Sequence, residues 1–90
     1  KRLDVRTTNI TDLDLSSNIN LERIIGICNY SLKTVSIKNG NNNAINIFSF
    51  KSNNPVLVCV KVDDVNLAEL KNNWSKPNHC IYSFDCRNSI

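Results

Sequence analysis

The sequence predicts a mainly β repeat solenoid, a right-handed coil of short parallel strands with little helix and a cap at its C-terminal end. Three observations support this fold class. Apolar residues recur in the spacing L-x-x-L-x-L-x-x-N, whose last position is Asn three times and Gly once, and five such units begin 11, 11, 13 and 12 residues apart. The units are separated by Asn- and Gly-rich turns, such as residues 39–43. Because units this short can bury their apolar residues only against each other, they are expected to stack.

Within each unit the L-x-L part has the period of a β-strand, whose side chains alternate between two faces. The closing Asn suits a tight turn, because its amide can bond backbone groups there. A β-sandwich shares the strand density, but it has no reason to repeat this apolar spacing. The expected inward positions are, in chain order, Leu3, Val5, Ile10, Leu13, Leu15, Leu21, Ile24, Gly26, Leu32, Val35, Ile37, Ile45, Phe48, Phe50, Leu57, Val60 and Val62.

The segment after Val62 departs from the repeat as a cap would. Asp63 and Asp64 are N-cap candidates for a short helical turn, although the same carboxylates would also suit calcium. Trp74 offers a large apolar lid, and residues 80–84 are expected to form a last strand. The positions of the helical turn expected to face inward are Val65, Leu67, Ala68 and Leu70.

Composition excludes several classes of function. The net charge of +3 comes without a Lys/Arg-rich run, so no nucleic-acid partner is expected. The longest apolar stretch, residues 56–60, is far below the ~20 residues of a transmembrane segment. The four cysteines and single histidine lack ligand spacing for zinc, and no Gly-rich phosphate loop is present. We therefore expect no enzyme activity, no metal and no cofactor. The absence of methionine and the abrupt start indicate a processed or partial C-terminal segment.

The repeat resembles leucine-rich repeats, and more narrowly the nested kind in which a turn of about 21 residues holds two half-units. Residues 39–86 resemble the end cap of surface leucine-rich-repeat proteins of Bacteroidetes bacteria. The shared landmarks are Asn54-Pro55, Cys59 before "VKVDD", Trp74 in "NNWS" and "SFDC" ending at Cys86. On this basis residues 1–62 would hold the half-units, in about two and a half turns, and residues 63–90 the cap.

The resemblance implies a disulfide between Cys59 and Cys86. Such a bridge would enclose 28 residues and contribute about 3–4 kcal/mol in the chain-entropy description. Four cysteines in so short a chain also favour an oxidising compartment. For Cys28 and Cys80 two alternatives stay open. They form a second disulfide if the cap strand folds back over the second turn, and otherwise one or both are free thiols.

If each turn holds two half-units, alternate half-units form separate ladders with separate outward faces. One outward set is polar: Asp12, Asp14, Ser16, Thr34, Ser36, Lys38 and Lys61. The other set contains neighbouring isoleucines rimmed by basic residues, which is typical of a contact surface. We hypothesise a protein-binding face formed by Arg23, Ile25, Ile27, Ile47 and Lys51. In the alternative, "RIIGI" shifts by one position, so that Ile25 and Ile27 point inward and Gly26 outward.

The resemblance favours a non-catalytic binding scaffold, the C-terminal part of a secreted or cell-surface protein whose partner is a protein or a glycan. The alternative is a structural accessory subunit or tail of a larger outer-membrane assembly, with its apolar ladder permanently buried. Both interpretations place the chain outside the cytoplasm, at the cell surface in association with the outer membrane.

Overall fold

The computed structural model describes residues 1–86, so the last four residues of the expected cap, 87–90, lie outside the described part. The protein is mainly β with little helix, as the sequence predicts. The elements are β1 (Arg2–Arg6), β2 (Asp12–Asp14), β3 (Arg23–Ile27), β4 (Thr34–Ser36), a 3-10 turn η1 (Asn42–Ala44), β5 (Ile47–Ser49), β6 (Cys59–Lys61), α1 (Val65–Leu70), β7 (Trp74–Ser75) and β8 (Ile81–Ser83).

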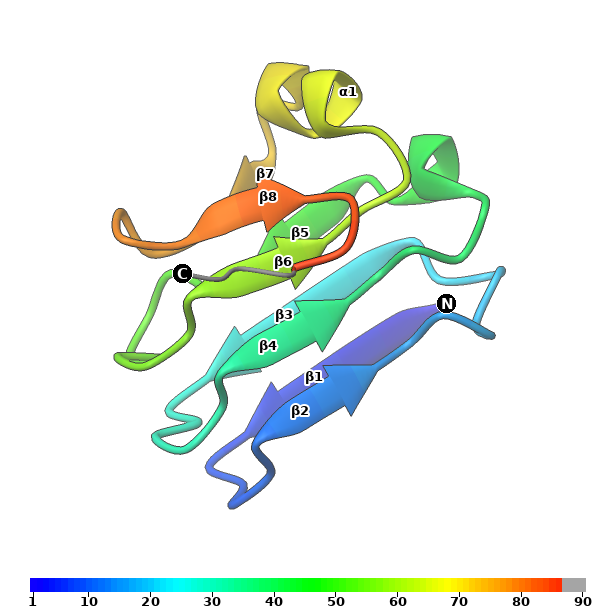
Figure 1. The fold of residues 1–90 in the computed structure, drawn as a ribbon. Coiled ribbons are helices and arrows are strands. Elements are labelled where there is room, and N and C mark those ends of the chain that lie inside the picture. Colours follow the sequence, from blue (N-terminus) through cyan, green and yellow to red (C-terminus); the bar gives the residue numbers. More distant parts are fainter. Residues whose placement is uncertain (87–90) are drawn as a thin grey trace.

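Alternate strands build two parallel four-stranded sheets (Figure 1). The odd sheet has the order β1-β3-β5-β7 and the even sheet the order β2-β4-β6-β8. Strands of the two sheets run in opposite directions, because the chain crosses from one sheet to the other after each strand (Figure 1). Alternate strands of the chain therefore lie in two separate parallel ladders.

The core lies between the two sheets. In the odd sheet Ile24 pairs with Phe48, and Phe48 pairs with Trp74. In the even sheet Val35 pairs with Val60 in the same way. The rings of Phe48 and Trp74 are 5.7 Å apart at their centroids. The fully buried aliphatic and aromatic residues are Ile24, Leu32, Val35, Ile37, Ile45, Phe48, Phe50, Leu57, Val60 and Val62.

The first two strands are less completely buried than the rest. Leu3 and Leu13 are half-buried and pack against the core from β1 and β2. Each of these strands has a neighbour on one side only. Ile10, which the repeat places inward, is instead 36% exposed. It lies in the loop before edge strand β2, where no preceding unit is stacked over it.

Two buried asparagines bond consecutive turns at one end of the strands. The side-chain amide of Asn29 donates to the Val5 carbonyl at 3.0 Å, and that of Asn54 donates to the Gly26 carbonyl at 3.0 Å. The backbone N–H of Asn29 in turn donates to the side-chain Oδ1 of Asn54 at 3.3 Å. The repeat spacing puts an asparagine of this kind at position 53, but the bonded residue is Asn54, so this turn holds one residue more than the turn after β3. Asn53 has φ 58° and Cys28 has φ 61°, so a left-handed residue comes directly before the bonded asparagine in both turns.

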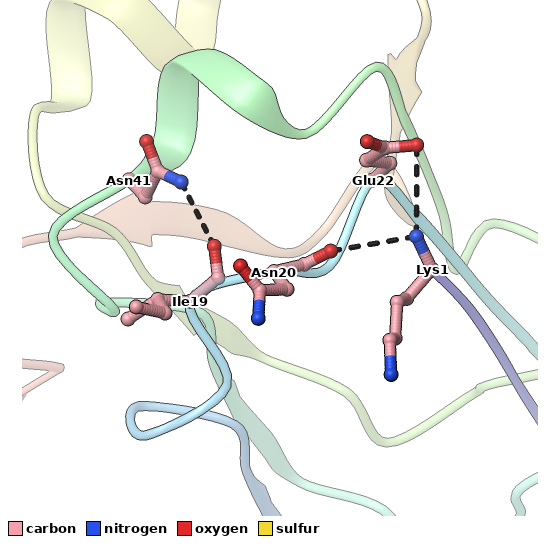
Figure 2. Close-up of polar contacts among 5 residues, drawn as sticks. All are labelled: Lys1, Ile19, Asn20, Glu22 and Asn41. Carbon is pink, nitrogen blue, oxygen red and sulfur yellow. Dashed lines mark hydrogen bonds and ion pairs between the residues drawn. The ribbon is translucent and has the colours of Figure 1, made fainter.

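Polar contacts also join neighbouring loops at the opposite end of the strands (Figure 2). The Asn41 side-chain amide donates to the Ile19 carbonyl at 2.8 Å. The backbone amino nitrogen of Lys1, not its side-chain Nζ, lies 3.4 Å from the Asn20 carbonyl oxygen and 3.5 Å from a Glu22 carboxylate oxygen. Both partners of the ion pair are exposed, so we expect it to contribute little to stability.

Asp64 is the N-cap residue of helix α1, and its carboxylate accepts hydrogen bonds from the backbone amides of Asn66 and Leu67. Ala68 is buried and Val65 packs on the core. The expectation that Leu70 faces inward is wrong, because this side chain is 77% exposed. Two helical positions rotate the direction of a side chain by about 200°, so Leu70 points away from the side on which Ala68 is buried.

Strand β7 places Trp74 over Phe48, where the indole is buried and its Nε1 donates to the Ile45 carbonyl at 3.0 Å. The residue thus covers the core as the sequence predicts, as part of the odd sheet. None of the helices within residues 1–86 has the length and apolar character needed to cross a membrane.

Candidate functional site

The odd sheet presents the three isoleucines on its outer surface. Ile24 and Gly26 are buried, whereas Ile25 and Ile27 alternate with them and are half-buried on the other side of β3. The shifted arrangement, with Gly26 outward, is not adopted. A Cβ atom at Gly26 would lie 2.1 Å from Cε2 of Phe50, so this position faces the core and has no room for a side chain.

Strand pairing brings the third isoleucine and the basic residues to the same surface. Ile47 lies opposite Arg23 in the register of β3 and β5 and is also half-buried. Lys51 follows β5 by two residues and is exposed, as is Arg23. We call the set Arg23, Ile25, Ile27, Ile47 and Lys51 the isoleucine face. It is an apolar strip on rigid backbone with a cation at each end.

The even sheet carries a hollow that sequence reasoning missed. A groove of about 460 Å³ runs over its outer surface, and we call it the polar groove. Its floor consists of outward side chains of β2, β4 and β6, and residues 85–86 form a wall. The sequence identified the floor residues as a polar set, but only the return of the C-terminal segment over the sheet makes them concave. The lining side chains used below are Asp12, Asp14, Thr34, Ser36, Lys38 and Lys61.

The carboxylates of the polar groove are held in place by hydrogen bonds. Asp12 accepts from the hydroxyls of Thr11 and Thr34. Asp14 accepts from the Ser16 amide nitrogen at 2.9 Å. The pKa of Asp14 is held below its ordinary value, mainly by the hydrogen bond from the Ser16 hydroxyl. The backbone N–H of Ser16 contributes next, and the charge of Lys61 contributes more weakly. The Asp14 carboxylate is therefore an ionised acceptor at neutral pH.

The predicted disulfide forms the base of the groove wall. Cys59 and Cys86 are bonded, with Cα atoms 5.8 Å apart. In β6 the neighbouring Val60 is buried in the core, so Cys59 points to the outer surface, where Thr34 is its partner in β4. The bond thus draws the end of the chain across the even sheet. Lys38 contacts the same segment, because its Nζ lies 3.1 Å from the centroid of the Phe84 ring.

The second disulfide considered from the sequence does not form, because Cys28 and Cys80 are both free thiols. Cys28 follows β3, and Cys80 precedes β8 in the other sheet. The coil containing β8 is two strand spacings, about 9.6 Å, beyond the coil containing β3. Two cysteines whose Cα atoms are more than about 7 Å apart cannot be bridged without backbone movement.

We expect the two free thiols to react at very different rates. Burial raises the pKa of Cys80 to about 11, against a smaller opposing effect of Lys76. The Cys80 thiol therefore stays protonated and inaccessible at pH 8, whereas Cys28 is only half-buried. Iodoacetamide at this pH should alkylate Cys28 first and Cys80 only after denaturation, as read by peptide mass mapping. Equal rates in the folded protein would contradict this burial.

Among residues 1–86, no group of three or more His, Cys, Asp and Glu side chains is placed to hold a metal ion. The two carboxylates considered for calcium both have partners within the fold. Asp64 caps α1, and Asp63 Oδ1 accepts from the Gly40 amide nitrogen at 3.2 Å. His79 is exposed while its neighbour Cys80 is buried, so the imidazole and the thiol do not lie together at the surface as a Cys–His pair.

Comparison of the chain with protein-family models, with curated proteins and with solved structures found no match.

Proposed function

We propose that this chain is a non-catalytic binding scaffold of the leucine-rich-repeat kind. It would form the C-terminal repeats and cap of a secreted or cell-surface protein, and it would bind a protein partner through the isoleucine face. The observation that carries the proposal is the outward position of Ile25, Ile27 and Ile47 on one strand pair. Outward strand positions are ordinarily polar where a sheet faces water.

The spacing of the strands supports the repeat assignment. Arg2 pairs with Arg23, 21 positions later, and Asp12 pairs with Thr34, 22 positions later. These separations agree with a nested turn of two half-units. The next three separations are 24 residues from Arg23 to Ile47, 25 from Thr34 to Cys59 and 26 from Phe48 to Trp74, and the last, from Cys59 to Ile81, is again 22. Buried Asn29 and Asn54, bonded to the carbonyls of adjacent turns, are the kind of contact that a stack of like units repeats.

The disulfide supports a location outside the cytoplasm. Disulfide bonds persist in oxidising compartments, including cell surfaces and the periplasm, and are rare where cellular reductants keep thiols reduced. The Cys59–Cys86 bond joins the cap to the third strand of the even sheet, so its formation would stabilise the whole C-terminal half.

The charges around the isoleucine face indicate the chemistry of the partner. Arg23 and Lys51 are exposed beside half-buried isoleucines. A partner surface with an apolar centre and flanking Asp or Glu side chains would complement both features. The guanidinium of Arg23 can pair with such a carboxylate in two parallel hydrogen bonds.

The proposal is tested by panning a phage-displayed random peptide library on the immobilised unmodified protein alone, and then measuring the affinity of the enriched peptides for an Ile25→Ser/Ile27→Ser variant. We expect peptides enriched on the unmodified protein to combine apolar residues with Asp or Glu. The variant should lose about tenfold or more in affinity for them. Both isoleucines are only half-buried, so circular dichroism should show the variant still folded.

The matched control is Val58→Ser, because Val58 is 49% exposed and lies outside the isoleucine face. This substitution should leave the affinity for the selected peptides unchanged. Peptides that bind a folded Ile25→Ser/Ile27→Ser protein as tightly as the unmodified protein would exclude the isoleucine face as the binding surface.

A further inference from the structure

We infer that the polar groove on the outer surface of the even sheet is a binding site for a neutral saccharide. This inference goes beyond the proposed function, because the groove lies on the opposite sheet from the isoleucine face and is lined by different residues. Four features of the groove suit such a ligand: its shape, the fixed hydrogen-bonding groups on its floor, its charges of both signs and the aromatic ring beside it.

The shape suits a small polar ligand. The volume of about 460 Å³ falls in the range of about 300–1,000 Å³ typical of small-molecule sites. The floor is a β-sheet, and the wall is tied down by the Cys59–Cys86 bond. The site is thus formed before a ligand arrives, which limits the entropy lost on binding.

The floor offers hydrogen-bonding groups at fixed spacing. Asp12 and Asp14 lie two residues apart on β2, with Thr34 and Ser36 opposite them on β4. Neighbouring strands are about 4.8 Å apart, and alternate residues on one strand are about 6.8 Å apart. Polar groups spaced on this scale can contact hydroxyls on different sides of one sugar ring or on neighbouring rings. The carboxylates accept, the Thr34 hydroxyl can also accept because its proton is donated to Asp12, and the Ser36 hydroxyl can both donate and accept.

The charges favour a ligand without net charge of its own. The groove is lined by two carboxylates on β2, those of Asp12 and Asp14, and by two lysines from the neighbouring ladder positions, Lys38 and Lys61. Asp85 also lines the groove, and it already interacts within the chain, for example with the Ser83 hydroxyl. An anion would meet the aspartates and a cation the lysines. The hydroxyls of a neutral sugar can instead donate hydrogen bonds to the aspartate carboxylates and accept them from the lysine ammonium groups.

Phe84 adds an apolar surface next to these polar groups. Its ring is 58% exposed, and the Lys38 ammonium rests against one side of it. Lys38 itself lines the groove, so the ring stands beside it. A sugar ring has C–H groups as well as hydroxyls, and an exposed aromatic ring is a suitable partner for them.

The test uses the ¹⁵N-labelled protein of 90 residues and NMR titration with four neutral tetrasaccharides: a β-1,4-glucan, an α-1,4-glucan, an α-mannan and a β-galactan. A tetramer of galacturonic acid is the charged comparison. We expect at least one neutral tetrasaccharide to shift amide signals of residues 12–16, 34–38 and 61, with those of residues 23–27 unchanged. Asp14→Asn should weaken this binding about tenfold, the loss of one charge-assisted hydrogen bond.

The matched control is Asp4→Asn, an exposed aspartate on the opposite sheet, which should leave the titration unchanged. The Ile25→Ser/Ile27→Ser variant should also bind the saccharide normally, so failure of the groove and failure of the isoleucine face are separately visible. The inference is overturned if no neutral tetrasaccharide shifts the groove amides at about 10 mM. It is equally overturned if only the galacturonic acid tetramer binds, or if a folded Asp14→Asn protein binds undiminished.

Discussion

Replacing Cys59 and Cys86 together by serine is expected to lower the free energy of unfolding by about 3–4 kcal/mol. The two cysteines are separated by 27 positions, and the bond restricts a loop of that length in the unfolded chain. In a domain of 90 residues this is a large share of a total that is typically about 5–15 kcal/mol. Denaturation in urea, followed by tryptophan fluorescence, measures the change through Trp74.

The unmodified protein treated with a thiol reductant gives an independent measurement, because it lacks the bond without any substitution. It should lose a similar amount of stability. The control is Cys28→Ser, which removes a half-buried free thiol and should change the free energy of unfolding by no more than about 0.5 kcal/mol. Equal stability of the oxidised protein and the folded double variant would show that the bond contributes nothing.

Gly26→Ala is expected to cost about 1–3 kcal/mol through overpacking. The added Cβ would lie 2.1–2.6 Å from three atoms of the Phe50 ring. This ring cannot easily withdraw, because it is fully buried and stacks on Phe48 with centroids 4.9 Å apart. The core would therefore have to shift around it. Thermal unfolding by circular dichroism measures the cost.

A control glycine separates crowding from backbone conformation. Gly40 has φ +78° and nothing within 4 Å of an added Cβ, so Gly40→Ala meets only the left-handed backbone cost of about 1–2 kcal/mol. Phe50→Leu should reduce the penalty of Gly26→Ala, because the smaller side chain leaves room for the new methyl group. Strictly additive effects of these two substitutions would contradict the contact between positions 26 and 50.

Much of the fold followed from the spacing of apolar residues along the chain. The ladders of alternate units were predictable because a strand exposes alternate residues to one face, and a unit of 11 to 13 residues is too short to bury its own. The same pattern predicted that Ile25 and Ile27 share a face, but it left that face ambiguous. The neighbouring Phe50 decides it, by filling the space beside Gly26.

Other features depended on local geometry that the repeat does not encode. The turn after β5 holds one residue more than the turn after β3, so the bonded asparagine is at position 54 and not at position 53. Helix α1 ends at Leu70, on the side away from Ala68, so an apolar residue there stays in solvent. In each case a shift of one or two positions along the chain decides which side chain is buried.

The sequence by itself indicated most of the residues that face inward, with Ile10 and Leu70 as exceptions. It also indicated that short strands pair in two parallel ladders and, through its resemblance to capped repeats, which cysteines bond. Only the tertiary structure decided that Cys28 and Cys80 stay apart and that the polar ladder becomes a groove. The physical reason is distance along the chain. Inward positions follow from neighbouring residues, whereas the groove joins residues 12–38 to residues 85–86, and no local pattern records that contact.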